Sequence, residues 1–472
     1  MGQERDREDV PDGTRAGFLR RLAVRRRSKW FMFCAVLSIV CTGVNGFAAP
    51  AGRGASAPDP ERRQRKIVIF REGTQDTERF DAVGRHGGLS RRRLARLNAL
   101  VADIPEQQIK ALRRHGRVKA IHDDVPMRGD AITFVPVAAP AVEAYPWGQE
   151  AIGVPAARQL LVGLPLAGVR VAVMDTGIDG NHPELQAAVV GGYNAMSGGN
   201  PSNYDDDNGH GTHMAGIIAA AGNGQGVIGT VQQTQLVAVK VLDSAGQGYL
   251  SDFLNGMEWV MTQNVQVVNM SLSFDVGSPL LEQAIQEMYE AGIIIVASAG
   301  NRCKGTVAND SGGDDSGGDD SGGDDSGGDD SGGDNVIPCT IAQDPMQGGV
   351  KYPGRYAEVI AVGGVDVNNQ RASYSRTGPE VTLVAPGGSS ATGKVLSTIM
   401  GSQYAYGSGT SQATAHVAGA IATVLQIAPS LTPTQVLTLL QTTATDLGLP
   451  ATEQGVGLVD VEGMVRTLLG LP

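Results

Sequence analysis

From about Leu166 onward, six short apolar runs recur along the chain, with segments of helical character between them. The runs are continuous rather than alternating, as expected for parallel strands that helices cover on both faces. They occupy residues 169–174, 236–242, 265–272, 293–299, 359–364 and 381–385. Helices are expected between or after them at residues 209–221, 250–262, 278–291, 410–427 and 432–443. The pattern predicts a three-layer α/β domain with a parallel sheet, in which sites gather at the carboxyl ends of the strands.

A smaller domain is expected upstream, from residue 66 to about residue 128. Its expected elements are strands at 66–70 and 118–122, an apolar stretch at 97–104 and a helix at 105–116. This order predicts a small α+β domain. Residues 50–65 are expected to form a linker, and the proline-rich residues 129–142 are expected to form an exposed linker and processing region.

The first 49 residues have the pattern of an export signal. A cluster of arginines precedes the apolar run Trp30–Val44, and small residues follow that run. The run is shorter than the roughly 20 apolar residues that a membrane span needs. A secreted protein is therefore expected, and a signal retained as a membrane anchor is the alternative.

Charge is distributed unevenly along the chain. Residues 1–139 carry 27 basic and 16 acidic side chains, whereas residues 140–472 carry 11 and 33. Such asymmetry suggests parts with separate roles that attract each other. The basic part lacks aromatic residues interleaved with its arginines, which argues against a nucleic-acid-binding function.

Three polar residues stand where strands end or helices begin. Asp175 directly follows an apolar run, His210 begins a glycine-lined helix, and Ser411 begins a long apolar helix. Each alone also fits an ordinary structural role in a turn or a helix cap. Together, at one edge of a parallel sheet and in the order Asp, His, Ser, they predict a nucleophilic triad.

The motifs around these three residues resemble those of the subtilases, the subtilisin-like serine proteases. The resemblance runs from about Val142 to the C-terminus and includes "ASAGN" and "YPGRYAEVIAVGGVD". Residues 66–128 resemble the inhibitory propeptide of that family. The resemblance implies a subtilisin-like fold for residues 143–472, a ferredoxin-like propeptide domain before it, and a serine endopeptidase made as an autoprocessed zymogen.

The family pattern implies further roles near the triad. Asn301 in "ASAGN" stands where the family has a side-chain amide that binds the oxyanion, and the backbone N–H of Ser411 supplies a second donor. Two residues depart from the pattern, because Gln412 replaces the usual Met and Ala415 replaces the usual Pro. Neither supplies a catalytic atom, so activity is expected and the local helix packing is in question.

Substrate is expected to bind by strand addition. The resemblance implies backbone contacts from Ser271, Leu272 and Ser273, although the same residues also fit an ordinary sheet strand. Arg302 and Lys351 stand at positions that line the family's main specificity pocket. Their charges predict tolerance of Asp or Glu before the scissile bond. The alternative is that both long side chains turn into solvent.

Calcium is the structural ion that the resemblance implies. The stretch "AAAGNGQGVIG" resembles a family calcium loop, and oxygen-rich loops of this kind suit Ca²⁺. The implied ligands are the side chains of Glu143, Glu184 and Asn223 and the carbonyl groups of Ala221, Gln225 and Val227. A glycine-rich turn that binds nothing is the alternative. Self-cleavage is expected between about Asp130 and Tyr145, and a cut after Glu143 would remove that residue from the calcium site.

An acidic repeat interrupts the catalytic region. Five copies of Asp-Ser-Gly-Gly-Asp fill residues 310–334, inside an insertion at 304–338 that Cys303 and Cys339 bracket. In an exported chain these two cysteines predict a disulfide. Low hydrophobicity and like charges predict a disordered loop, with a specific metal site as the alternative.

Two further expectations concern partners. The expected partners are protein or peptide substrates and the chain's own propeptide as inhibitor, and the enzyme is expected to be a monomer. A rival interpretation is a non-catalytic subtilase scaffold that binds calcium or a partner through the acidic insertion. The complete Asp, His, Ser and Asn set argues against that rival.

Overall fold

The computed structural model of the chain describes residues 62–129, 134–302, 349–389 and 393–472. The expected signal at 1–49, most of the expected linker at 50–65, and the acidic insertion with Cys303 and Cys339 lie outside these residues. Within the described ranges, no helix has both the length and the apolar character needed to cross a bilayer.

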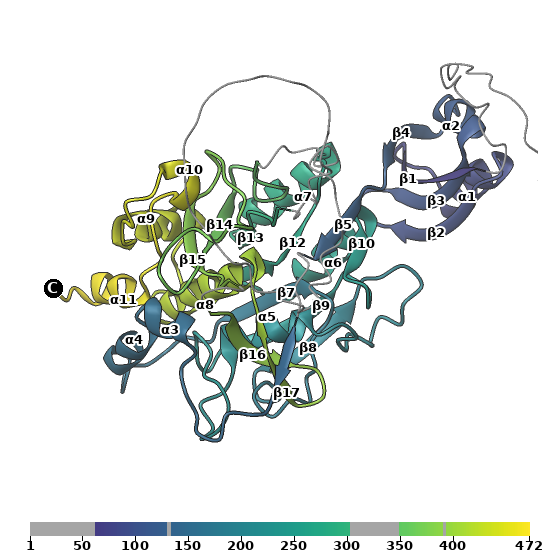
Figure 1. The fold of residues 1–472 in the computed structure, drawn as a ribbon. Coiled ribbons are helices and arrows are strands. Elements are labelled where there is room, and N and C mark those ends of the chain that lie inside the picture. The colour runs from purple at the N-terminus through teal and green to yellow at the C-terminus, as the bar shows by residue number, and fades with distance from the viewer. Residues whose placement is uncertain (1–61, 130–133, 303–348, 390–392) are drawn as a thin grey trace, which may run out of the picture. The chain divides into compact units, whose positions relative to one another are not determined.

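A parallel sheet forms the middle layer of the larger part of the chain (Figure 1). Among the described residues it has seven strands, in the order β15-β14-β13-β11-β7-β9-β8. The strands are β7 (Arg170–Asp175), β8 (Val189–Asn194), β9 (Gln235–Lys240), β11 (Val267–Met270), β13 (Ile294–Ser298), β14 (Val359–Val365) and β15 (Leu383–Pro386). The six predicted runs are confirmed. Strand β8 was not predicted, since Gly191 and Gly192 interrupt its apolar pattern.

Helices cover both faces of this sheet, which confirms the three-layer α/β fold. Side chains of β7 alternate between the faces, so Val171 and Val173 join one apolar cluster and Ala172 and Met174 join the other. The first cluster includes α5 (His210–Ala219), α8 (Thr410–Ile427), α9 (Pro433–Thr443) and α11 (Val461–Leu469). The second includes α6 (Leu250–Val260) and α7 (Pro279–Glu290).

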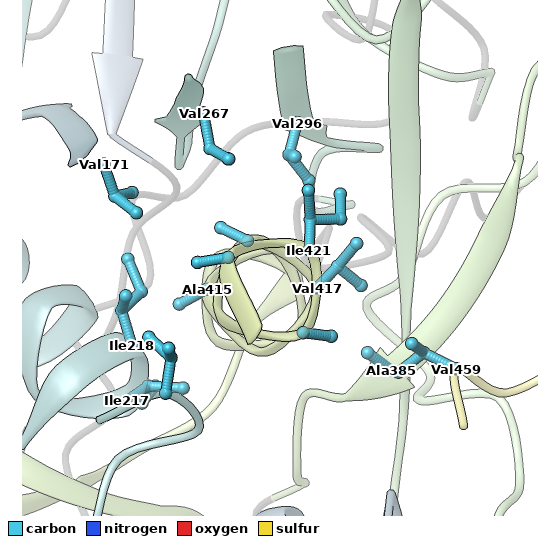
Figure 2. Packing of buried hydrophobic residues seen from close by; sticks show 14 of the residues in the cluster. Val171, Ile217, Ile218, Val267, Val296, Ala385, Ala415, Val417, Ile421 and Val459 are labelled. Atoms are coloured by element: carbon cyan, nitrogen blue, oxygen red, sulfur yellow. The ribbon is translucent and has the colours of Figure 1, made fainter. Parts of the chain in front are cut away.

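Helix α8 runs through the core, and every residue from 410 to 426 is buried, most of them small or apolar. Figure 2 shows the helix along its axis, with Val171, Val267 and Val296 of three strands on one side of it. Such a helix is stable only when it is enclosed. Ala415 and Gln412, which depart from the family pattern, are both fully buried within it. Within the described residues, neither the nitrogen nor the oxygen of the Gln412 side-chain amide has a hydrogen-bond partner. Gln412 thus places an unpaired polar group in the core.

The strand order has a topological switch point at β7. From β7 the chain continues to β8 and β9 on one side of the sheet and then to β11, β13, β14 and β15 on the other. Ligands bind at such a switch point in open α/β sheets, outside the carboxyl ends of the strands. Asp175, the last residue of β7, therefore lies where chemistry is expected.

The upstream part folds as a four-stranded antiparallel sheet with two helices, called here the N-terminal subdomain (residues 62–125). The strand order is β2-β3-β1-β4. The elements are β1 (Arg63–Phe70), α1 (Asp76–Arg85), β2 (Leu89–Leu94), β3 (Ala99–Pro105), α2 (Glu106–Arg113) and β4 (Val118–Asp123). This order of elements is that of a ferredoxin-like fold. Neither α1 nor β2 was predicted, because both are rich in charged residues. Strand β1 also begins within the expected linker 50–65.

Two short sheets tie the following segment to the larger part of the chain. Strand β5 (Pro126–Gly129) lies between β10 (Gln247–Tyr249) and β12 (Leu272–Ser273), antiparallel to both. Strand β6 (Val135–Val137) pairs with β17 (Gln403–Gly407), which pairs with β16 (Val395–Ile399). Residues 135–137 of the expected exposed linker therefore form strand β6, and two of these three residues are exposed. Its one proline is tolerated because β6 is an edge strand.

Candidate active site

Three side chains from separate elements form a hydrogen-bonded chain. The Nδ1 atom of His210 lies 2.7 Å from Oδ1 of Asp175, and its Nε2 atom lies 3.1 Å from Oγ of Ser411. Asp175 and Ser411 are fully buried, and His210 is 4% exposed. The carboxylate can fix the imidazole tautomer, and the imidazole can then accept the serine proton.

Glycine and a buried aspartate set the position of His210. Gly209, at the N-cap of α5, has φ +105°, in the left-handed region that favours glycine. A Cβ atom on Gly211 would lie 2.0 Å from the carbonyl oxygen of Gly177, so the turn after β7 can approach α5 only here. Asp206 accepts hydrogen bonds from the N–H groups of Gly209 and Thr212. Asp206 was not among the predicted site residues, because it stands in no recognisable motif.

Ser411 is the second residue of α8. The first four N–H groups of a helix have no acceptor within the helix, so the Ser411 N–H is available to a ligand. The neighbouring strand also contacts this residue, because the hydroxyl of Ser271 donates to the Ser411 carbonyl oxygen at 3.1 Å. The structure thus brings together the expected nucleophile and the expected substrate strand.

Asn301 lies beside the start of α8. Its Oδ1 atom accepts from the backbone N–H of Thr410 at 3.1 Å and from the Thr410 hydroxyl at 2.9 Å. With the amide oxygen occupied in this way, the amide NH₂ group is the end that can donate to a substrate. Two donors, this NH₂ group and the Ser411 N–H, are therefore available near the serine hydroxyl.

Comparison with known proteins agrees with this geometry. The model of the subtilase family matches residues 167–458, which is more than half of the chain. The chain belongs to the subtilase family. Subtilisin E of Bacillus subtilis (strain 168) is 32% identical over 447 residues, which cover 94% of this chain and 100% of the relative. Subtilisin Savinase of Lederbergia lenta is 39% identical over 324 residues, which cover 69% of this chain and 100% of the relative. The chain is therefore a subtilisin-like serine endopeptidase, an enzyme that acts on protein substrates.

In this subtilase, strand β5 pairs with the residues that were expected to bind substrate. Leu272 pairs with Gly129 and Ser273 pairs with Arg128, while β10 pairs with β5 from the other side. The side chain of Met127 is buried among apolar residues beside β10. Leu272 and Ser273 form β12, and Ser271 lies between β11 and β12. The sequence analysis did not predict β10, whose short glycine-containing segment resembles a turn.

The two basic residues of the expected specificity pocket both have polar neighbours. The Nζ atom of Lys351 lies 2.8 Å from Oδ1 of Asp275, and only 13% of the lysine side chain is exposed. Arg302 donates from its NH2 atom to the hydroxyl of Thr377 at 3.0 Å. Lys351 is therefore not turned into solvent, and a carboxylate accounts for part of its charge.

Four of the six expected calcium ligands meet in one region through described contacts. Oε1 of Glu143 accepts from the N–H of Gly224, and Oε2 of Glu184 lies 3.3 Å from Nδ2 of Asn223. Val227 forms an isolated bridge with Ala144, which follows Glu143. Ala221 and Gln225 lie in the same loop. Burial raises the pKa of Glu184, and the negative charge of Glu143 raises it further, whereas the Tyr404 hydroxyl lowers it.

The chemistry of this region suits a bound cation. Its donors are oxygen atoms, the kind that Ca²⁺ prefers, and two carboxylates raise each other's energy when nothing positive lies between them. Within the described residues, no backbone N–H donates to the carbonyl groups of Ala221, Gln225 and Val227 outside regular elements. No group of three or more His, Cys, Asp or Glu side chains gathers there or elsewhere in the described residues. Backbone carbonyls would therefore have to supply the rest of the shell.

The N-terminal subdomain contacts the catalytic region through charged groups. Asp124 accepts from both the N–H and the hydroxyl of Ser251, at 2.7 Å each, in the first turn of α6. Arg65 lies 2.6 Å from the same carboxylate, between Nε and Oδ2. Arg92 lies 3.5 Å from Asp252. Burial raises the pKa of both carboxyl groups, and the arginines oppose that rise. The basic and acidic parts of the chain therefore meet here.

His213 and His416 are buried on α5 and α8, the two helices that carry His210 and Ser411. Burial lowers the pKa of His213 to about 3 and the pKa of His416 to about 4. Nε2 of His213 lies 3.1 Å from the Ala405 carbonyl oxygen, and Nδ1 of His416 lies 2.8 Å from that of Gln412. In the unfolded chain these imidazoles bind protons below about pH 6.5. In the folded protein they stay neutral until the pH falls much further, so the unfolded state binds more protons in this range. Acid therefore destabilises the packing around α5 and α8.

Proposed function

We propose that this subtilase is a secreted endopeptidase made as an inhibited precursor that cuts itself. Ser411 is the nucleophile, His210 the general base and acid, and Asp175 the group that orients the imidazole. Asn301 and the Ser411 N–H bind the oxyanion. The observation that carries these roles is the unbroken contact from Asp175 through His210 to Ser411.

The chemical steps follow from these contacts. His210 Nε2 takes the proton of the Ser411 hydroxyl as its oxygen attacks the peptide carbonyl. Asp175 stabilises the imidazolium that forms, and the two N–H donors stabilise the negative carbonyl oxygen. His210 then returns the proton to the leaving amine, and water hydrolyses the acyl-enzyme by the same route.

A fluorophosphonate probe tests these assignments. The protein should be labelled at one residue, Ser411, and a Ser411→Ala variant should not be labelled, because only a hydroxyl activated by a neighbouring base reacts at a useful rate. Labelling at another serine, or equal labelling of a His210→Ala variant, would contradict the assigned roles.

The N-terminal subdomain is proposed to act as the inhibitory propeptide. Support comes from β5, which fills the substrate strand position between β10 and β12. The antiparallel register pairs Leu272 with Gly129, so a chain extended by one residue brings that residue opposite Ser271, whose carbonyl oxygen lies 3.4 Å from the Ser411 Oγ. In this sequence the next residue is Asp130, which is followed by Ala131. We therefore assign self-cleavage to the bond between them, which also leaves Glu143 in the mature enzyme.

The charged contact of the subdomain supports a second role in folding. Arg65, Asp124 and Ser251 join the two parts at the first turn of α6, and Arg96 adds a 2.9 Å ion pair with Glu287 on α7. A parallel sheet with long-range pairing folds slowly. A docked subdomain that binds α6 and α7 would stabilise these elements before the sheet is complete.

An acidic residue before the scissile bond is the proposed substrate preference. Arg302 and Lys351 favour it by charge, and Asp130 at the assigned processing site agrees with it. The ion pair between Lys351 and Asp275 opposes this preference, because the carboxylate of Asp275 offsets the positive charge of the lysine. Replacing Asp275 with Asn should therefore raise the preference for Glu over Leu by about two- to fivefold, since partly exposed ion pairs contribute about 0.5–1 kcal/mol.

Peptides that differ only at this position would measure that preference as a ratio of kcat/KM values. A Glu282→Gln variant removes a carboxylate from the first turn of α7 and should leave the ratio unchanged. Cleavage mainly after Leu or Phe, with Glu disfavoured in both the unmodified enzyme and Asp275→Asn, would refute the preference.

Calcium is the proposed structural ion, held by Glu143, Glu184, Asn223 and the carbonyl groups of the loop 221–227. A bound cation stabilises only the folded state, so removing it with EDTA should lower the unfolding temperature by about 5–10 °C, given calcium at about 100 times its Kd. Thermal unfolding with and without EDTA measures this shift.

Two variants make the calcium test specific. Glu184→Gln should abolish most of the EDTA shift, whereas Glu290→Gln on α7 should retain it. An equal EDTA shift in all three proteins would place the ion elsewhere, and no shift in the unmodified protein would rule out a stabilising calcium ion.

A further inference from the structure

A buried arginine lies directly behind the proposed oxyanion residue. Arg376 is 1% exposed and is the largest fully buried side chain among the residues that the structure describes. A guanidinium loses much hydration free energy on burial, so such a group is retained only where it makes several hydrogen bonds. Arg376 belongs to the loop between β14 and β15, and its side chain reaches the segment that follows β13.

The guanidinium joins two points that are far apart in the sequence. Its Nε atom donates to the carbonyl oxygen of Asn301 at 3.1 Å, and its NH1 atom donates to that of Gly349 at 3.0 Å. Its backbone N–H donates to the carbonyl oxygen of Gly300 at 3.1 Å. Asn301 and Gly349 lie on either side of residues 303–348, the segment that carries the acidic repeat. One side chain therefore fixes the distance between the two ends of that segment.

The backbone around Asn301 leaves little room for movement while Arg376 is present. Gly300 has φ +94°, and a Cβ atom there would lie 3.2 Å from Cδ of Arg376 and 2.9 Å from Cγ of Lys351. Asn301 also forms an isolated bridge with Ser375. Its amide oxygen is held by Thr410, as described above. The residue is thus fixed on the amide side by α8 and on the carbonyl side by Arg376.

We infer that Arg376 is a positioning residue for oxyanion stabilisation. It acts through Asn301 and does not touch the substrate. A displacement of about 1 Å in a catalytic group can cost about 100-fold in rate. The planar fork of Arg376 binds the carbonyl oxygens of Asn301 and Gly349 together, which holds the backbone of Asn301 in place. This inference rests on the oxyanion role proposed for Asn301.

The test is a double-mutant cycle between Arg376→Met and Asn301→Ala, with kcat and KM measured on a peptide anilide. Each variant is produced as the full chain and, where it does not process itself, is matured with tagged unmodified enzyme that is then removed. Arg376→Met should lower kcat about 10- to 100-fold with little change in KM. In the Asn301→Ala background the same substitution should lower kcat less than about twofold, because the group it positions is gone.

Arg170→Met is the matched control. Arg170 also binds a backbone carbonyl, that of Gln263, but at the opposite end of β7. It should leave kcat unchanged in both backgrounds. A tetrahedral inhibitor provides a second readout: a peptide aldehyde should bind Arg376→Met more weakly, whereas a product peptide should bind it as before.

Each alternative result is decisive. Equal losses of kcat with and without Asn301 would show a general structural role and overturn the inference. If Arg376→Met does not fold, Arg376→Lys takes its place, and an unchanged kcat in that variant would overturn the inference because lysine lacks the fork. An unchanged kcat in Asn301→Ala alone would overturn the oxyanion role and the inference together, whereas a loss there without a loss in Arg376→Met would overturn only the inference.

Discussion

Replacing Ser411 with Ala should lower kcat by about a million-fold, the loss found when a subtilisin loses its nucleophile. His210 Nε2 lies 3.1 Å from the Ser411 Oγ, so the substitution leaves the base with no hydroxyl to activate. The oxyanion donors and substrate binding remain, and they keep the rate about 1,000- to 10,000-fold above that of uncatalysed hydrolysis in water. The same variant should also fail to cut itself.

Mass spectrometry of the purified protein measures the second effect. Ser411→Ala should retain the N-terminal subdomain, whereas the unmodified protein should begin at Ala131. Ser278→Ala is a suitable control, because Ser278 caps α7 by accepting from the N–H groups of Leu280 and Leu281. Its loss should cost about 1 kcal/mol of stability without affecting processing. A Ser411→Ala chain cut at Asp130 by itself would show that another group performs the cleavage.

Replacing Asn301 with Ala should lower kcat about 100- to 1,000-fold with little change in KM. This is the loss measured when a subtilisin loses its own oxyanion asparagine. The donor acts mainly on the charge that develops in the transition state, so substrate binding is largely preserved. The Oδ1 contacts with Thr410 show that the amide is oriented before substrate arrives.

Asn255→Ala separates this effect from the general loss of an asparagine. Asn255 donates from Nδ2 to the Tyr193 hydroxyl and to the Ala195 carbonyl oxygen on α6's side of the sheet. Its replacement should alter stability and leave kcat unchanged. A rise in KM with unchanged kcat in Asn301→Ala would contradict an oxyanion role and indicate a contact made equally in the ground state.

Most of the catalytic fold could be predicted because its signals are local. Continuous apolar runs identify buried parallel strands, and the strand ends then locate Asp175 without any knowledge of its partners. His210 and Ser411 lie in the first turns of α5 and α8, where polar residues mark the start of a helix. Strand β8 was missed because Gly191 and Gly192 hide its pattern, and α1 and β2 were missed because charge hides theirs.

The remaining parts of the site depend on contacts between distant segments. Nothing near Met127 indicates that its strand pairs with both β10 and β12. The sequence predicts the positive charge of Lys351 but does not indicate that Asp275 forms an ion pair with it. The role of Arg376 could not be predicted, because its partners Asn301 and Gly349 are distant from it in the sequence and lie on either side of an insertion. Such pairings are set by tertiary packing, which local sequence does not encode.

The placement of β5 between two strands has a consequence for which proteins this enzyme can digest. Strand β5 uses backbone pairing on both of its edges, with β10 on one side and β12 on the other. Any chain that takes its place must present several consecutive residues free of its own secondary structure. A folded target is therefore cut only as often as it opens locally, so its half-life should follow the free energy of that opening. Resistance to this protease would then measure the rigidity of the target more than its sequence.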